Sequence, residues 1–420
     1  MNSLAQMNSN NPDTNMINRR GFIKTSSVVT AGSLLGGSLA SLAAAPAVVG
    51  VTLSGHRLKR PLAIAMWDFS WLERRWPGAG YEDWDQALDE LKERGYDAVR
   101  IDAYPHLIAA GAEREWELLP CWNQHVWGSP ALCRVRVQPA LNEFIAKCGK
   151  RGILVGLSTW FREDAAENLC TKIASPEELG RIWKVTLDSI SPELRRHILY
   201  VDFCNEFPSH ISTPFLPKDF KRHSPEGERW MRDSIAVARR EYLQFSYTFS
   251  IDREFDSLRE QNTSFLDFLE PHVWMTNFSD FYQQVGYKWE TFDPVGYERI
   301  VAKAETLYRS KPAYWQSRLE YGIHLLADWS RASGKPLITT ECWGVVVFKD
   351  WPLLNWDWVK DLTEHGVRTA SATGCWAALA TSNFCGPQFK GMWRDIAWHR
   401  RLTDVIHHGK LPNYPLQLKS

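Results

Sequence analysis

The fold is decided by the stretch His197-Ile198-Leu199-Tyr200-Val201-Asp202-Phe203-Cys204-Asn205-Glu206. Its apolar and aromatic residues are typical of a buried strand, but the strand ends in an amide and a carboxylate rather than in turn residues. A second apolar run, Lys335-Pro336-Leu337-Ile338-Thr339-Thr340-Glu341, also ends in a carboxylate. Polar side chains at the carboxyl ends of buried strands are typical of parallel α/β folds, in which that edge of the sheet carries the functional site.

Apolar runs and amphipathic stretches alternate on both sides of this strand, from Pro61 onward. We predict strands over residues 62–67, 97–102, 152–157, 197–206, 245–251, 273–278, 335–341 and 370–377. We predict helices over residues 81–94, 137–151, 177–189, 227–240, 255–269, 297–333, 356–365 and 392–407. Eight alternations predict an α/β fold, a single (β/α)8 TIM barrel. The alternative is a doubly wound open sheet, but no glycine-rich nucleotide-binding motif follows an early strand.

The N-terminus is typical of an export signal. Asn18-Arg19-Arg20-Gly21-Phe22-Ile23-Lys24 matches the twin-arginine pattern, a Gly/Ser/Ala-rich stretch follows, and Ala45-Pro46-Ala47 offers a cleavage site. The alternative is a membrane anchor, for which the stretch holds too many Gly and Ser residues. We therefore expect a signal peptide at 1–47, a linker at 48–60, the barrel at 61–410 and a C-terminal tail at 411–420. The mature chain is expected in the periplasm or outside the cell, after passage through the twin-arginine export machinery and without stable membrane insertion.

The composition restricts the classes of partner and cofactor that we expect. The chain has 420 residues with 49 basic and 49 acidic side chains, and no basic block, so nucleic acid is not an expected partner. Trp is the outlier, at 21 residues; indole rings stack on sugars, but they also fill cores. The eight Cys form no C-x-x-C pair and zinc-binding His patterns are missing, so no metal or cofactor is expected. Two loop disulfides are possible in an oxidising compartment, Cys121 with Cys133 or Cys375 with Cys385, and the sequence does not decide whether either forms.

The strand-end side chains suggest a chemistry. In a barrel the carboxyl ends of all strands meet at one face, so Glu206 and Glu341 are expected to lie opposite each other. Two carboxylates in one cleft are what glycosidic bond cleavage requires, because one protonates the leaving oxygen and the other attacks or stabilises the sugar cation. These two are the candidate catalytic residues. The candidate substrate-binding residues are Arg100, Asn205, Trp376, Trp67, Trp160, Asn277, Tyr282 and Trp343.

Several of these residues also have a structural interpretation. Arg100 either keeps the nucleophile ionised or forms an ion pair at the barrel mouth. Trp376 either forms the floor under a sugar or packs in the core. His272, just before the sixth predicted strand, is interpreted as a strand-start residue rather than a catalytic one, and His106 is a weaker candidate still.

The combination of Val99-Arg100-Ile101, Asn205-Glu206, Thr340-Glu341 and Trp376 resembles the retaining glycoside hydrolases of clan A. Within them it is most similar to the cellulase-like (family 5-type) group, over roughly Pro61 to His408. The resemblance implies that Glu206 is the acid/base and Glu341 the nucleophile. It also implies that Arg100 orients Glu341, that Asn205 contacts the sugar 2-hydroxyl and that Trp376 lines the sugar subsite.

Three features depart from the cellulase pattern. Phe207 stands between the Asn-Glu pair and Pro208, where typical cellulases have Pro directly. The third strand ends in Ser158-Thr159-Trp160 instead of near a His. The sixth strand ends in Thr276-Asn277-Phe278, with Tyr282 further on, instead of in a His and a Tyr. These departures bear on sugar specificity rather than on the two-carboxylate chemistry.

The sequence thus predicts an exported retaining O-glycoside hydrolase that cleaves an oligo- or polysaccharide, with a β-glycoside as the expected linkage, by double displacement. The first alternative is a non-catalytic carbohydrate-binding protein on the same barrel. The second is a metal-dependent barrel hydrolase, which the missing His-x-His motif disfavours. The long loop from Pro105 to Arg134 carries three Trp residues, and an exo mode of action follows if that loop closes one end of the cleft.

Overall fold

The structure is a computed structural model that describes residues 50–123, 125–288, 294–351 and 353–414. The predicted signal peptide at 1–47 lies outside the described residues, as does most of the predicted C-terminal tail. The described residues form one compact unit. Among the described residues, no helix combines the length and the apolar character needed to cross a membrane.

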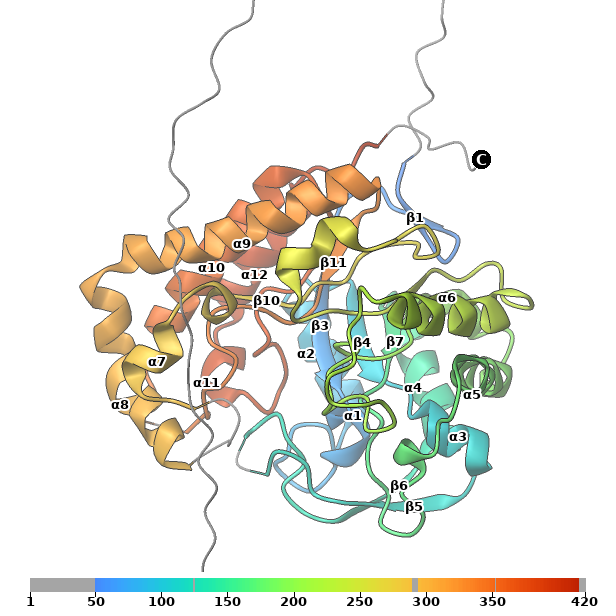
Figure 1. Ribbon diagram of the computed structural model, residues 1–420. Coiled ribbons are helices and arrows are strands. Elements are labelled where there is room, and N and C mark those ends of the chain that lie inside the picture. Colours follow the sequence, from blue (N-terminus) through green and yellow to red (C-terminus); the bar gives the residue numbers. More distant parts are fainter. Residues whose placement is uncertain (1–49, 124, 289–293, 352, 415–420) are drawn as a thin grey trace, which may run out of the picture. The chain divides into compact units, whose positions relative to one another are not determined.

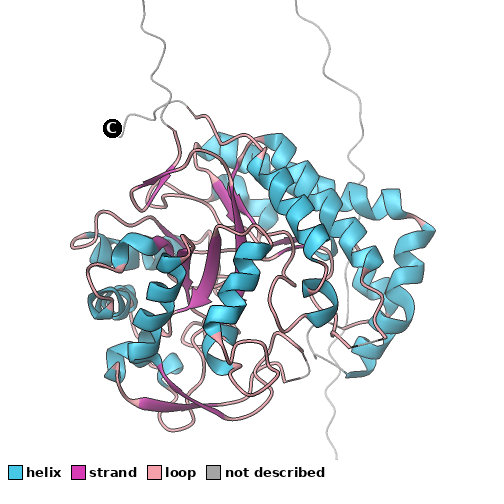
Figure 2. Cartoon of the chain, turned by 180° about the vertical axis from the view of Figure 1, so that it is seen from behind, coloured by secondary structure: helices cyan, strands magenta, loops and turns pink. Residues whose placement is uncertain are grey.

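A barrel of parallel strands occupies the centre of this unit, with helices packed around it (Figures 1 and 2). Seven strands follow the order β11-β13-β3-β4-β7-β8-β9. Their bounds are β3 Leu62–Asp68, β4 Ala98–Asp102, β7 Leu154–Ser158, β8 Ile198–Asp202, β9 Tyr247–Thr248, β11 Leu337–Thr339 and β13 Trp376–Leu379. The predicted fold class is confirmed.

The sixth barrel strand, β10 (Val273–Trp274), closes the gap between β9 and β11. Parallel bridges join Ile251 to Pro271 and Leu269 to Leu337, on the two sides of this segment. β10 also pairs with β12 (Cys342–Trp343), and the Val273 N–H donates to the Glu341 carbonyl at 3.0 Å. The segment from residue 269 to 274 is therefore part of the barrel wall, and it begins earlier than the predicted strand at 273–278.

Helices follow most of the strands. The larger ones are α2 Trp84–Glu93, α4 Val137–Lys150, α5 Pro176–Ser189, α6 Pro225–Arg239, α8 Pro294–Ser310, α9 Pro312–Ser333, α10 Asp357–Thr373 and α12 Ile396–His407. The shorter ones are α1 Ser70–Glu73, α3 Pro105–Gly111, α7 Phe281–Val285, α11 Lys390–Trp393 and the 3₁₀ turns Leu169–Thr171, Arg195–His197, Phe255–Glu260 and Met275–Phe278. The helix predicted over 255–269 is only the 3₁₀ turn Phe255–Glu260, so short segments link β9 to β10.

Local sequence explains where the regular helices begin. Ser175 and Ser224 are N-caps whose hydroxyls accept the backbone N–H of Glu178 and Gly227, and a proline follows each serine at the first helical position. Asp83 caps α2 in the same way through two backbone N–H groups. These caps fix the entry of α2, α5 and α6 and leave their apolar faces against the barrel.

The region predicted as a linker, 48–60, contains a hairpin of β1 (Thr52–Leu53) and β2 (His56–Arg57). Val51, Leu53 and Leu58 are buried against the first residues of several barrel strands, among them Ala98 and Leu199. The hairpin therefore covers the amino ends of the strands, at the end of the barrel opposite to the predicted site.

The long loop predicted from Pro105 to Arg134 contains α3 and a second hairpin of β5 (Glu115–Leu118) and β6 (Cys133–Arg136). Between these strands the chain carries Trp122 and Trp127, and Cys121 pairs with Ser129 through two backbone hydrogen bonds. All eight thiols of the chain are free in the structure, so neither loop disulfide left open by the sequence is formed.

Candidate active site

Arg100 is the central side chain at the carboxyl end of the barrel. It lies on β4 and is fully buried. Its Nε and Nη2 donate to the two oxygens of Asp68 at 2.8 and 3.1 Å, and Nη2 also donates to Glu341 Oε1 at 2.8 Å and to Asn205 Oδ1 at 2.5 Å. Nη1 donates to Thr340 Oγ1 at 2.6 Å and to Glu270 Oε1 at 3.3 Å. One guanidinium thus faces three carboxylates, and its planar fork of donors suits several acceptors at once.

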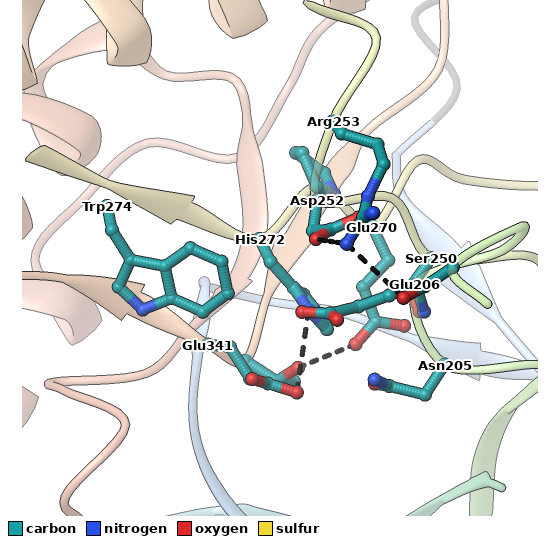
Figure 3. Close-up of polar contacts among 12 residues, drawn as sticks. Asn205, Glu206, Ser250, Asp252, Arg253, Glu270, His272, Trp274 and Glu341 are labelled. Atoms are coloured by element: carbon teal, nitrogen blue, oxygen red, sulfur yellow. Dashed lines mark hydrogen bonds and ion pairs between the residues drawn. The ribbon is translucent and has the colours of Figure 1, made fainter. Parts of the chain in front are cut away.

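His272 lies between the two candidate catalytic carboxylates (Figure 3). Its Nδ1 is 3.0 Å from Glu206 Oε1 and 3.4 Å from Glu341 Oε1. Its Nε2 is 2.9 Å from Arg100 Nη1, and because a guanidinium has only donors, this nitrogen must be the acceptor. The ring is therefore neutral with its proton on Nδ1, and burial together with Arg100 lowers its pKa well below the usual value. Its Nδ1–H donates to Glu206, and Glu341 is the next carboxylate beyond it.

Glu206 and Glu341 come from opposite parts of the sheet but both lie close to His272 Nδ1. Glu206 follows β8, and its backbone adopts φ 53°, a left-handed conformation that is uncommon for a non-glycine residue. The backbone N–H of Glu206 donates to Ser250 Oγ at 2.9 Å, which holds this unusual turn in place. Glu341 follows β11. One oxygen each of Glu206 and Glu341 and one ring nitrogen of His272 all lie within 4.8 Å of one another, so the two carboxylates lie side by side.

The electrostatic environments of the two glutamates differ. Burial raises the pKa of Glu206 well above its ordinary value, and the neighbouring Asp252 and Glu341 carboxylates add to the rise. Burial also raises the pKa of Glu341, but the Arg100 guanidinium opposes that rise most strongly. Arg100 is hydrogen-bonded to Glu341 and favours its ionised form, whereas Glu206 contacts the neutral His272.

Asn205 lies beside Glu341 with one half of its amide unused. Its Oδ1 accepts from Arg100, which fixes the orientation of the amide, so Nδ2 is the free end. This Nδ2 is buried and has no hydrogen-bond partner. In Figure 3 it points toward Glu341. An unpaired buried donor is unfavourable unless a ligand satisfies it, so this atom indicates where a polar group of a substrate lies.

A pocket opens above these groups. Asp252 and Arg253 follow β9 and form an ion pair at 2.5 Å on one side of it. Aromatic rings form much of the rest. The lining residues are Met66, Asp68, Trp122, Trp127, Trp160, Glu206, Ile211, Asp252, Arg253, Trp274, Glu341, Val346 and Asn383.

The structure brings five of the ten predicted site residues together. Glu206, Glu341 and Trp160 line the pocket, and Arg100 and Asn205 contact Glu341 or its guanidinium partner from behind. The Trp160 ring is held by its Nε1–H, which donates to Asp68 Oδ2 at 2.8 Å.

The other five predicted residues do not line the pocket. Trp67, Trp343 and Trp376 are buried in the core, and their indole N–H groups donate to the Cys385 carbonyl, the Ala380 carbonyl and Thr339 Oγ1. Asn277 caps the turn after β10 by accepting from the Trp274 N–H, and the Tyr282 hydroxyl accepts from the Val346 N–H. These side chains support the structure around the pocket but do not form its surface.

Sequence reasoning missed His272, Asp252 and Trp274. His272 was interpreted as a strand-start residue, yet its backbone N–H already donates to the Ile251 carbonyl in the barrel wall. The available signal was an alternation with a period of two, since Glu270, His272 and Trp274 share one face. Asp252 follows a strand that is only two residues long in the structure, and its position offered no comparable signal.

The same cluster has the residue types of a metal site. Glu206, His272 and Glu341 are close enough to share an ion. However, a histidine ligand needs a free nitrogen lone pair, and His272 presents Nδ1–H to the carboxylates because Nε2 accepts from Arg100. The cluster therefore fits proton sharing between two carboxylates better than it fits metal coordination.

Comparison with known proteins shows the family to which this barrel belongs. A family model described as "Sugar-binding cellulase-like" matches residues 64–407, and the chain belongs to this cellulase-like family. No curated protein matches the chain.

Among solved structures, a candidate glycoside hydrolase from Parabacteroides distasonis is 50% identical, with 84% of this chain and 95% of that chain covered and a TM-score of 0.81. A GH5_18 protein from Streptomyces cattleya in complex with GlcNAc is 11% identical (84% and 82% covered, TM-score 0.48). An endocellulase from Pyrococcus horikoshii, crystallised with cellotetraose, is 13% identical (84% and 94% covered, TM-score 0.47).

Proposed function

We propose that the protein is a retaining O-glycoside hydrolase in which Glu206 is the acid/base and Glu341 the nucleophile. In the first step the Glu341 carboxylate bonds to the anomeric carbon as the glycosidic C–O bond breaks, and Glu206 gives its proton to the leaving oxygen. In the second step water attacks the anomeric carbon, its proton passes to Glu206, and the bond to Glu341 breaks.

One observation carries this proposal: His272 Nδ1 lies 3.0 Å from Glu206 and 3.4 Å from Glu341, and one oxygen of each carboxylate lies within 4.8 Å of the other. Retaining enzymes hold their carboxyl groups about 5–5.5 Å apart, whereas inverting enzymes need about 6.5–9.5 Å to admit a water. The short separation favours retention.

The charges support the assignment of roles. Arg100 lies 2.8 Å from Glu341 and favours its ionised form, which a nucleophile requires. Glu206 contacts the neutral His272 instead and has Asp252 as a neighbour, which favours the protonated form that an acid requires. The free Nδ2 of Asn205 is a donor for the sugar 2-hydroxyl, beside the anomeric carbon.

The test is to follow hydrolysis of an aryl β-glycoside by the mature chain with NMR. Retention is expected, so the β-anomer of the sugar forms first and mutarotates later. Glu341→Gln should abolish turnover without loss of the folded circular dichroism spectrum, and Glu143→Gln, an exposed glutamate on α4, is the matched control. First formation of the α-anomer, or full activity of Glu341→Gln, contradicts the proposal.

A carbohydrate-binding protein without turnover is the second candidate, because the matching family model is described as sugar-binding. Saturable binding of oligosaccharides with no release of product over long incubation supports this candidate.

We also propose export through the twin-arginine route, from the motif at Asn18–Lys24. Replacing both Arg19 and Arg20 by Lys should retain the precursor inside the cell, as fractionation and immunoblotting will show.

A further inference from the structure

Glu270 is a buried carboxyl group that has no part in the proposed reaction steps. It lies two residues before His272 in the barrel wall, and it is not among the residues that line the catalytic pocket (Figure 3). Its Oε1 accepts from Thr340 Oγ1 at 2.8 Å and from the Tyr200 hydroxyl at 3.3 Å, and lies 3.3 Å from Arg100 Nη1. Its Oε2 is buried, and no described residue donates a hydrogen bond to it. All the donors therefore converge on one of the two oxygens.

Arg100 has too few hydrogens on this side to form a strong ion pair with Glu270. Its Nη1 carries two hydrogens, and three acceptors lie within reach of them. The two shorter contacts are with Thr340 Oγ1 at 2.6 Å and with His272 Nε2 at 2.9 Å, so the contact with Glu270 is the longest. Glu341, by contrast, accepts directly from Nη2 at 2.8 Å. The positive charge of Arg100 therefore compensates Glu341 more closely than it compensates Glu270.

The contacts of Glu270 suit a neutral carboxylic acid. A buried carboxylate without a matched cation is far more unfavourable than a buried neutral group, so such a group tends to keep its proton. The Thr340 and Tyr200 hydroxyls are neutral donors to Oε1, which leaves Oε2 as the oxygen that carries the proton. Burial and the Asp202 carboxylate raise the pKa of Glu270, and Arg100 opposes that rise. The titratable or charged groups that face Glu270, directly or through Arg100, are Asp68 on β3, Arg100 on β4, Tyr200 and Asp202 on β8, His272, and Glu341 after β11.

We propose that Glu270 is a positioning residue for the nucleophile and that it acts as a neutral acid. This role rests on the proposed function. The Thr340 hydroxyl accepts from Arg100 Nη1 and donates to Glu270 Oε1, and Thr340 directly precedes Glu341 in the chain. Glu270 thus fixes the hydroxyl that holds one end of the guanidinium. A charged Glu270 would draw Nη1 toward itself, and because the guanidinium is rigid and planar, Nη2 would move with it and away from Glu341.

The first test compares two substitutions of Glu270. Glu270→Gln keeps the shape, the neutral charge and the acceptor oxygen, so kcat/KM should stay within about threefold of the wild-type value. Glu270→Leu removes the acceptor of Thr340, so kcat should fall by about 10- to 100-fold, because a small displacement of a catalytic group has an effect of this size. KM should change little, since Glu270 does not line the pocket. Glu143→Gln, at an exposed position on α4, is the control and should leave both constants unchanged.

The second test measures the charge of Glu270. If this residue is neutral in the wild-type chain, Glu270→Gln leaves the pKa of Glu341 and the acidic limb of the kcat/KM–pH profile in place. A charged Glu270 would raise the pKa of Glu341, so its replacement by Gln would move that limb to lower pH. The infrared difference spectrum between the wild-type chain and Glu270→Gln at neutral pH should contain the carbonyl band of one protonated carboxyl group. Glu206 contributes equally to both spectra and cancels.

Four outcomes overturn this role: an acidic limb that moves to lower pH in Glu270→Gln, equal losses of activity in the two variants, full activity of Glu270→Leu, or a carboxylate band in place of the carbonyl band. If Glu270→Leu does not fold, the pH profile and the infrared band of Glu270→Gln decide. The infrared measurement requires no substrate, so it tests the charge of Glu270 independently of turnover. If the wild-type chain cleaves no glycoside, the proposed function fails instead.

Discussion

Replacing Asn205 by Ala should affect catalysis much more than stability, because the two ends of its amide have opposite effects on the stability of the free protein. In the free protein Nδ2 is buried without a partner, and such a group costs about 1–3 kcal/mol. Oδ1 accepts from Arg100, a charge-assisted hydrogen bond that contributes about 1.5–3 kcal/mol. The substitution removes both terms, so the free energy of unfolding should change by less than about 2 kcal/mol.

Activity should respond much more strongly. A hydrogen bond from Nδ2 to the sugar 2-hydroxyl strengthens in the transition state, so its loss should remove about 1.5–3 kcal/mol, and each 1.4 kcal/mol is a factor of ten in rate. Asn205→Ala should therefore lower kcat/KM for an aryl glycoside by about 10- to 150-fold. Urea unfolding measures the stability of the same preparation.

A substrate comparison makes the reasoning specific. The 2-deoxy analogue lacks the group that Nδ2 is proposed to contact, so the wild-type chain should process it slowly and Asn205→Ala should lose little further activity on it. This is a double-mutant cycle with one partner on the substrate. An equal loss on the 2-hydroxy and 2-deoxy substrates would refute the proposed contact and would point to a general disturbance of Arg100 instead.

Three further predictions concern the carboxylates. Glu341→Ala should abolish turnover. Azide should restore part of the activity by entering the space left by the side chain, and the product should be a glycosyl azide of inverted configuration. A product of retained configuration would argue against Glu341 as the nucleophile. Glu206→Ala should slow substrates with poor leaving groups far more than activated aryl glycosides, because only the former need protonation, so equal losses in kcat/KM would contradict its role as acid. Burial and the Asp252 carboxylate raise the pKa of Glu206, so Asp252→Asn should lower that pKa. The basic limb of the kcat/KM–pH profile should therefore move to lower pH, and further than the acidic limb does. An upward or absent shift of the basic limb would show that Asp252 does not act on Glu206.

The meeting of Glu206 and Glu341 was predictable because strand ends of a closed parallel barrel converge. The prediction needed only that two apolar runs be strands and that each end in a carboxylate, and both runs lie on strands of one sheet, β8 and β11. The left-handed backbone at Glu206 was not predictable, since nothing in the local sequence resembles a glycine turn. It depends on Ser250, a residue 44 positions away, whose hydroxyl accepts the Glu206 N–H.

The roles of the Trp residues were harder to predict, because a ring lines the pocket only if it lies at the carboxyl end of its strand. Trp376 was predicted at the end of a strand over 370–377, but α10 continues to Thr373 and Gly374 ends it with a φ of 68°. The strand β13 therefore begins at Trp376, which puts the ring at the wrong end of the strand for the pocket. Gly374 was the signal for the end of this helix, but the alanines in the last turn of the helix were interpreted as the start of the strand.

The sixth strand shows why the supporting side chains escaped prediction. Pro271 interrupts the apolar run, and a proline within a run argues against a central strand. In the barrel this proline is tolerated because the segment is bridged only at single positions, Pro271 to Ile251 and Leu269 to Leu337. Glu270 and His272 flank it and both contact Arg100, so the alternation that selects the inward face continues across the proline. The same segment closes the barrel and supplies the His272 ring that lies against both glutamates, and a slip of one residue would turn His272 away from both.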